Sequence, residues 1–189
     1  MSYDVIIIGA GPTGSSAALF TAKAGKKTLV IDNDQSVTKR AWIENHYGVE
    51  AITGPDLVEI GKKQAAKFGA EFIQGKATHL EKSGDILFRV TTENESYEGS
   101  HVILATGLSV ELAEAAGIRT KPGTEPRIKA IVDADAQGRS SLSGVWAAGT
   151  TAGVSMHTII TAGDGAKVAI HVISEINGER YVDHDVLKA

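Results

Sequence analysis

The segment VIIIGAGPTGSSAALF constrains the fold of this chain more than any other part of its sequence. A run over residues 3–8, apolar except at Asp4, leads directly into three closely spaced glycines, Gly9, Gly11 and Gly14. A continuous apolar run is typical of a central parallel strand that is buried on both faces. Because residues 13–24 are rich in small helix-forming side chains, the segment predicts a strand, a tight glycine turn and a helix.

A second apolar run, KKTLVID, ends in Asp32 and completes a strand–helix–strand unit of about 30 residues. In such a unit the first glycine permits a sharp turn, the second lets the backbone approach a pyrophosphate, and the third lets the helix pack closely on the strand. The start of the helix offers N–H groups to the phosphates. An acid at the tip of the second strand accepts hydrogen bonds from ribose hydroxyls. We interpret the unit as dinucleotide-binding; an ordinary glycine-rich turn in an α/β sheet is the alternative.

The composition narrows the classes of function. The chain has 189 residues, 42% of them hydrophobic, so we expect one domain over residues 1–189. A net charge of -4 argues against a nucleic-acid partner. The sequence has no cysteine, and its histidines lack the spacing of metal ligands, so we expect neither thiolate chemistry nor a metal site. No signal-like segment or membrane-length apolar run is present, which favours a cytoplasmic protein without a membrane partner.

The remaining patterns predict a Rossmann-like α/β fold of three layers, with a central parallel sheet, helices on one face and a small antiparallel β-meander on the other. After a polar loop over residues 33–53, a helix is predicted to start near Thr53. Alternating stretches over about 76–104 predict the meander, whose apolar end, HVILA, should rejoin the main sheet. KPGTEP is predicted to be a loop. The last helix is predicted over residues 158–177, with one apolar face made by Ile159, Ala162, Ala166, Ala169, Ile170 and Ile173.

Four segments in this order resemble the FAD domain of the thioredoxin reductase family: VIIIGAGPTGSSAALFTAKAGKKTLVID, IENHYGVEAITGPDLVEIGKKQAAKFGAE, VILATG and GVWAAG…ITAGDGAKVAI. The resemblance covers nearly the whole chain, with only residues 108–129 poorly matched. It implies that FAD is the cofactor. A meander that returns through VILATG also differs from an NAD domain, which continues with alternating strands and helices.

The resemblance implies a series of FAD contacts from the adenosine to the flavin ring. The glycine turn and the tip of the second strand would hold the pyrophosphate and the adenosine ribose, the backbone of Ala77 would meet the adenine, and Asn45 would lie against the isoalloxazine. The 149–150 turn would meet the ribityl chain. The start of the last helix would face the pyrimidine ring and stabilise negative charge on a reduced flavin. The full set is Gly9, Gly11, Pro12, Thr13, Gly14, Asp32, Asn33, Asn45, Ala77, Ala105, Thr106, Gly107, Gly149, Thr150, His157, Thr158 and Ile159.

The sequence also departs from the family pattern. Only about 40 residues separate Thr106 from Trp146, too few for the NADPH domain that the family inserts there. The paired redox cysteines are absent, and the loop after Asp32 lacks the family's GGQ. Thr150 stands where the family has an aspartate on the ribityl chain, so that contact is weakened or made differently. A dithiol thioredoxin reductase reaction is therefore not expected from this chain.

Three functions remain open. The first is a single-domain FAD-dependent oxidoreductase that exchanges electrons with an external donor and acceptor, each a small molecule or a protein, with no catalytic residue assigned. The second is a non-catalytic FAD- or nucleotide-binding module, or a subunit of a larger redox complex. The third, NAD at the same glycine turn, is disfavoured because NAD needs neither Asn45 nor the ATG and WAAG motifs. The resemblance also implies a homodimer.

Several further residues could have either a functional or a purely structural role. His157 could donate to the reduced flavin or gate a substrate, or it could simply cap a helix. The basic residues 39–40 could meet a phosphate, but a solvated loop is favoured. Asp164 could approach the flavin, although we expect it on an exposed helix surface. Three side chains around the ENHYG segment could cover the flavin ring or could equally be loop anchors: Trp42, His46 and Tyr47.

Overall fold

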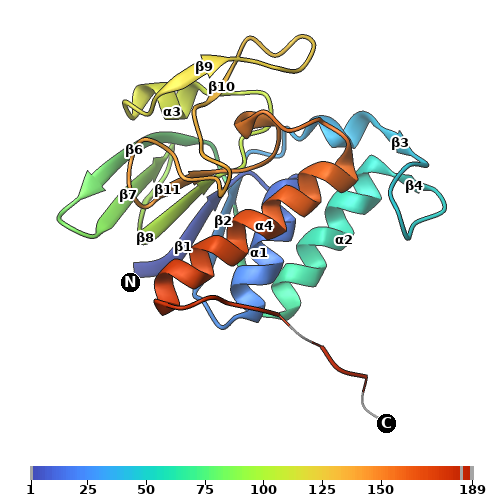
Figure 1. Ribbon diagram of the computed structural model, residues 1–189, viewed down its shortest axis with the longest axis horizontal. Helices are drawn as coiled ribbons and strands as arrows, with labels where there is room; N and C mark the ends of the chain where they lie inside the picture. Colours follow the sequence, from blue (N-terminus) through green and yellow to red (C-terminus); the bar gives the residue numbers. More distant parts are fainter. Residues whose placement is uncertain (1, 184, 188–189) are drawn as a thin grey trace.

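A seven-stranded sheet forms the centre of the protein, for which a computed structural model describes residues 2–183 and 185–187 (Figure 1). Its strands follow the order β5-β2-β1-β8-β7-β6, with β11 paired to β8. They span Ser2–Ile8 (β1), Thr28–Asp32 (β2), Glu71–Gln74 (β5), Ala77–Ser83 (β6), Leu87–Thr92 (β7), Ser96–Leu104 (β8) and Val145–Ala147 (β11).

The central strands are parallel and in a register that brings their carboxyl ends together. Ile8 at the end of β1 lies beside Ile31 of β2 on one side and Leu104 of β8 on the other. All five residues of β2 are buried, as expected for a strand covered on both faces. The glycine turn, Asp32 and Ala105 therefore leave the sheet at the same edge.

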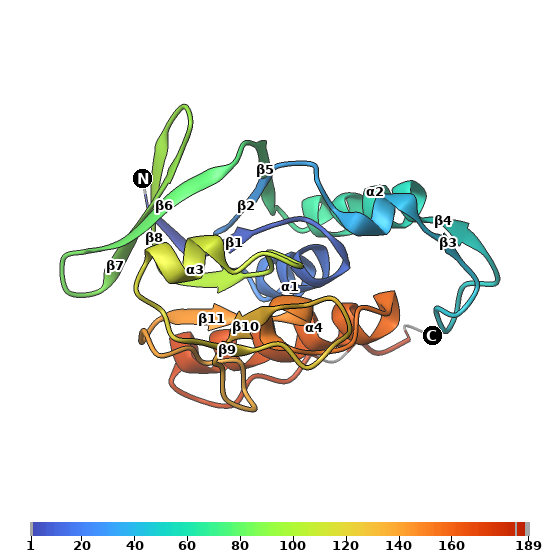
Figure 2. The same cartoon turned by 90° about the horizontal axis from the view of Figure 1, so that it is seen from above.

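Three helices cover one face of the sheet: α1 (Pro12–Lys23), α2 (Gly54–Lys67) and α4 (Thr158–Asn177). Helix α1 lies between α2 and α4 and contacts both (Figure 2). One core cluster joins these helices to Val5 and Ile7 of β1. A second cluster packs Leu80 and Val90 of the meander against Ile6 on the opposite face. The predicted three-layer α/β fold is confirmed, and β8 links the meander to the main sheet by pairing with both β7 and β1.

Short elements appear where only loops or single stretches were expected. The stretch EFIQGKATHLEK, whose pattern predicts one strand of the meander, divides at Gly75 into β5, which is parallel to β2, and β6, which belongs to the meander. The 33–53 loop contains a 3-10 turn, η1 (Val37–Arg40), and a small ladder of β3 (Trp42–Ile43) with β4 (Ile52–Thr53). The prediction that KPGTEP forms a loop was wrong for its first two residues. They lie in β9 (Thr120–Pro122), which pairs with β10 (Ala130–Val132). Among the described residues, no helix is long and apolar enough to cross a membrane.

The buried face of α4 differs from the predicted apolar face. Of the predicted residues, Ala169 and Ile173 are fully buried, but Ile159 is 37% exposed. The helix also buries a glycine and three polar residues, together with two valines outside the predicted set: Thr158, Thr161, Asp164, Gly165, Val168 and Val172. A Cβ on Gly165 would lie 2.1 Å from the Thr13 oxygen, so α4 approaches α1 too closely for larger side chains. Apolar periodicity alone could not identify this face.

Removing the cap of α2 should destabilise the protein by about 1 kcal/mol. The Thr53 hydroxyl accepts a hydrogen bond from the Asp56 backbone N–H at 3.2 Å, as the sequence pattern indicated. We expect Thr53→Ala to lower the free energy of unfolding in urea by that amount, and Thr53→Ser, which keeps the hydroxyl, to change it little. An alanine variant as stable as wild type would contradict this role.

Candidate functional site

A cavity of about 580 Å³ opens at the carboxyl ends of β1, β2 and β8. The edge formed by these strand ends is where open α/β sheets bind their ligands. Residues of the glycine turn, the tip of β2, the start of β6, the 105–109 turn and the short helix α3 (Glu111–Ala115) line it. Thr150, Met156 and Thr161 complete the wall on the side of α4. The cavity thus joins segments that lie far apart in the chain.

The glycine turn brings the start of α1 against the end of β1. Gly9 has a φ of 103°, and a Cβ on Gly14 would lie 1.8 Å from the Gly9 oxygen, so neither position tolerates a larger residue without displacement. Helix α1 starts at Pro12, and in the described part of the chain no side chain caps it and no acidic residue occupies its first turn. Its N–H groups and positive dipole end are therefore available to an anion beside the cavity.

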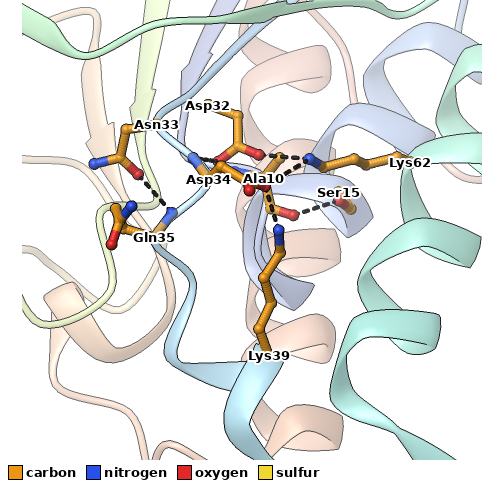
Figure 3. Close-up of polar contacts among 8 residues, drawn as sticks. All are labelled: Ala10, Ser15, Asp32, Asn33, Asp34, Gln35, Lys39 and Lys62. Atoms are coloured by element: carbon orange, nitrogen blue, oxygen red, sulfur yellow. Dashed lines mark hydrogen bonds and ion pairs between the residues drawn. The ribbon is translucent and has the colours of Figure 1, made fainter.

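Asp32 sits in a network of donors at the tip of β2 (Figure 3). Its Oδ1 accepts hydrogen bonds from the Ala10 N–H at 3.3 Å and the Asp34 N–H at 3.2 Å. Its Oδ2 pairs with the Nζ of Lys62, from α2, at 2.5 Å. A further ion pair joins Lys39 to Asp34, and the hydrogen bond from Lys39 lowers the pKa of the Asp34 carboxyl. Asp32 is therefore held in one orientation at the cavity wall.

An apolar slot lies next to Asp32. Its walls come from Ile8 and Ile31 of the sheet, from Ala77 at the start of β6, and from Leu112 and Ala115 of α3. Helix α3 packs on β6 and so closes this end of the cavity. The contribution of α3 was missed from the sequence, because this part of the chain carries only weak patterns and the contact depends on the folded path.

The 149–152 turn, η2 (Gly149–Ala152), is fixed against α1 and α4. Gly149 has a φ of 75°, and a Cβ there would lie 2.2 Å from the Thr13 hydroxyl oxygen. Its N–H donates to Oδ2 of Asp164 at 2.7 Å, while Oδ1 of Asp164 pairs with Lys167 at 2.5 Å. The expected exposure of Asp164 was wrong: its side chain is 7% exposed, because the carboxylate faces the turn rather than solvent. This makes Asp164 a residue that positions the cavity wall.

Hydroxyl groups connect the two turns on either side of the cavity. Thr106 Oγ1 donates to the Ser109 carbonyl at 2.6 Å and lies 3.2 Å from Thr151 Oγ1. Thr151 Oγ1 in turn donates to the same carbonyl of Ser109. The ATG turn and the 149–152 turn are therefore linked to each other, although Thr150 itself lines the cavity.

The segments expected near a flavin ring lie together outside the cavity lining. His46 Nδ1 lies 2.9 Å from Thr158 Oγ1, which brings the ENHYG loop to the start of α4. His157 is the N-cap residue of α4, and its side chain lies 2.9 Å from Ser155 Oγ. Trp42 and Tyr47 are 65% and 92% exposed, so neither is a buried anchor of its loop. Of the three side chains around the ENHYG segment, only His46 therefore anchors its loop, through its contact with Thr158.

The predicted site residues divide into two groups. Six do not line the cavity: Gly14, Asn45, Gly149, His157, Thr158 and Ile159. Asn45 instead lines a shallow hollow formed by residues 44–50. Among the described residues, no three His, Cys, Asp or Glu side chains gather in a way that would hold a metal ion. The cavity brings together Gly9, Gly11, Pro12, Thr13, Asp32, Asn33, Ala77, Ala105, Thr106, Gly107 and Thr150.

The chain is similar to known proteins in both sequence and structure. The chain is 42% identical to a thioredoxin reductase of Aquifex aeolicus over 111 residues, which are 56% of this chain and 34% of the relative. It is 36% identical to a thioredoxin reductase of Listeria monocytogenes over 134 residues, 69% of this chain and 42% of the relative. The chain therefore spans less than half the length of these curated relatives.

Solved structures share the fold. The atypical thioredoxin reductase TRi from Desulfovibrio vulgaris Hildenborough matches with a TM-score of 0.84 at 22% identity, over 94% of this chain and 99% of that one. A thioredoxin reductase from Gloeobacter violaceus matches with a TM-score of 0.85 at 17% identity, over 98% and 99% of the two chains. At this identity the match concerns the fold alone.

A family model gives the clearest evidence of the family to which this chain belongs. The model described as "Pyridine nucleotide-disulphide oxidoreductase" matches residues 3–130, which include the glycine turn, the tip of β2, the start of the meander and the 105–109 turn. Sequence, fold and cavity therefore agree: this chain belongs to the pyridine nucleotide-disulphide oxidoreductase family and is similar to thioredoxin reductases.

Proposed function

We propose that this chain is an FAD-binding flavoprotein and an oxidoreductase that exchanges electrons with an external donor and acceptor. The observation that carries the proposal is the continuous cavity between the uncapped start of α1 and the fixed carboxylate of Asp32. The site combines a helix N-terminus for phosphates, a carboxylate acceptor for a ribose and an apolar slot for a base. These are the groups that a dinucleotide site requires. The homodimer and the identity of both electron partners stay predictions.

The residues that line the cavity are of the kinds that the adenosine, diphosphate and ribityl parts of FAD would need. The N–H groups of α1 would hold the pyrophosphate, Asp32 would accept a hydrogen bond from the adenosine ribose, and the slot at Ala77 and Leu112 would take the adenine. The Thr150 hydroxyl would meet the ribityl chain. The bound flavin would supply the redox chemistry, as cofactors do in such enzymes. The chain itself would bind the cofactor, orient it and shield it from water.

The start of α4 would act on the charge of the flavin. It has no side-chain cap and no acidic residue in its first turn, within the residues that the structure describes. A helix N-terminus near the pyrimidine ring stabilises negative charge and so favours the reduced state. Because the sequence has no cysteine, this chain cannot itself pass electrons to a disulfide through a dithiol.

A second function, a non-catalytic FAD module, is favoured by one observation. Thr150 is neutral and only 6% exposed, at the position where the resembling family places a carboxylate on the ribityl chain. We expect Thr150→Asp to tighten FAD binding if that contact is the weak point of the site.

Anaerobic reduction separates these two functions. The FAD-loaded protein is mixed with NADH or NADPH, and the visible flavin absorbance is followed before and after an acceptor such as a quinone is added. The oxidoreductase proposal predicts that a donor bleaches the flavin and that the acceptor restores its colour. Bound FAD that is reduced neither by these two donors nor by light would contradict it and support the module, whereas flavin that only light reduces would exclude NADH and NADPH as the donors.

A further inference from the structure

The carboxylate of Asp32 is largely occupied by the protein itself (Figure 3). Three donors reach it: two backbone N–H groups on Oδ1 and the Lys62 ammonium on Oδ2. An ionised carboxylate offers about four acceptor sites in all. About one site on Oδ2 is therefore left, which is enough for one of the two hydroxyls of an adenosine ribose.

Lys62 is well placed to fix this arrangement. It lies on α2, its side chain is 24% exposed, and it does not line the cavity, so it acts on a ligand only through Asp32. Its Nζ also lies 3.9 Å from Asp34 Oδ1, which keeps the ammonium between two carboxylates. An ion pair sheltered in this way is less screened than one on the open surface.

Helix α2 is held close to the glycine turn. A Cβ on Gly61, next to Lys62, would lie 3.0 Å from the Ser15 side chain on α1. The Ser15 hydroxyl donates to the Ala10 carbonyl at 2.9 Å, and the Ala10 N–H donates to Asp32. The ammonium, the glycine turn and the acid therefore form one connected network, in which a shift of Lys62 is passed to Asp32.

Lys62 also changes the charge that a nucleotide meets. Without its ammonium, the Asp32 carboxylate would face the cavity close to the start of α1, where a diphosphate would bind. Like charges repel, and the repulsion is strongest where water is partly excluded. The ion pair thus keeps Asp32 usable as an acceptor without opposing the phosphates.

We propose that Lys62 is a positioning residue that limits Asp32 to a single acceptor site and so makes the cavity read only one of the two adenosine ribose hydroxyls. This inference rests on the proposed function, because it takes the cavity to be an adenosine-nucleotide site. Lys62 itself touches no ligand.

The test uses nucleotides that lack one ribose hydroxyl. Calorimetry compares ADP with 2′-deoxy-ADP and 3′-deoxy-ADP on the full chain. In wild type, one deoxy compound should bind about tenfold more weakly than ADP, as expected for a lost hydrogen bond to a charged group, and the other should bind nearly as well. Lys62→Met frees a second site on Oδ2, so both deoxy compounds should then bind about tenfold more weakly than ADP, and the discrimination between them should be lost.

Two further variants control for the fold. Lys62→Arg keeps the cation and should retain the discrimination. Lys63→Met changes the adjacent residue, which is 73% exposed and pairs with Glu59 at 3.4 Å, and should bind all three nucleotides as wild type does. Lys62→Gln keeps a donor without the charge and serves if the methionine variant does not fold; a reduced discrimination is expected.

Some binding results would overturn the role of Lys62, and others would overturn the proposed function. A wild-type protein that rejects both deoxy compounds equally overturns the single acceptor site. A Lys62→Met or Lys62→Gln variant that weakens all three nucleotides by the same factor shows only a structural role and overturns the proposal. A protein that binds ADP but not FAD contradicts the proposed function and leaves this test intact. A protein that binds neither contradicts both.

Discussion

Replacing Gly14 by alanine should destabilise the protein by about 3 kcal/mol, the upper part of the range for overpacking, and weaken FAD binding by well over tenfold. The new Cβ would lie 1.8 Å from the Gly9 oxygen, 2.9 Å from the Gly9 carbonyl carbon and 3.4 Å from the Ala105 Cβ. The first two are backbone atoms, which cannot rotate away as a side chain does. Helix α1 must therefore shift, and its N-terminus moves away from the place where the pyrophosphate would lie.

The matched control is another glycine in a helix. A Cβ on Gly163 of α4 would meet no heavy atom within 4 Å, so Gly163→Ala gains helix propensity and should stabilise the protein by about 0.5–1 kcal/mol. Its FAD affinity should equal that of wild type. Urea denaturation and FAD titration of both variants test the pair; a Gly14→Ala protein that matches wild type in both would refute the close approach.

Removing the Asp164 carboxylate should be the second large effect. Asp164→Ala leaves the buried Gly149 N–H without its acceptor and releases the 149–152 turn, so we expect a loss of about 1–3 kcal/mol of stability. Because Thr150 lies in that turn and lines the cavity, FAD affinity should also fall. Asp164→Asn keeps an acceptor oxygen and should recover much of both losses.

The Lys167→Met variant distinguishes the effect of the Asp164–Lys167 ion pair from the effect of the Gly149 hydrogen bond. Lys167 is 46% exposed, so losing its pair with Asp164 should cost less than about 1 kcal/mol and leave FAD binding nearly unchanged. Thermal or urea denaturation gives the stabilities, and fluorescence titration gives the affinities. If Lys167→Met is as damaging as Asp164→Ala, the ion pair and not the Gly149 hydrogen bond is the main function of Asp164.

The features predicted well from the sequence are those with local causes. The turn at Gly9 and Gly14, the strand that ends in Asp32 and the cap at Thr53 each depend on residues that are close in the chain. Their spacing alone sets their geometry. The parallel direction of the central strands followed from the same units, because two strands joined through a helix on one face of the sheet run parallel.

The features that escaped prediction depend on contacts between distant segments. Lys62 reaches Asp32 from another helix, and Asp164 reaches Gly149 from the start of α4. Neither residue stands in a spacing pattern with its partner. Part of the buried face of α4 escaped prediction for a related reason, since close packing on α1 selects small residues such as Gly165, which carry no apolar signal.

The most direct test of the account is a titration of the purified, nucleotide-free chain with FAD, FMN and NAD in parallel. One FAD should bind per chain, with the visible flavin spectrum, and FMN should bind much more weakly, because it lacks the adenosine half that Asp32 and the Ala77 slot would hold. NAD should not displace FAD. A chain that takes up no FAD, or that binds FMN or NAD as tightly as FAD, would contradict it.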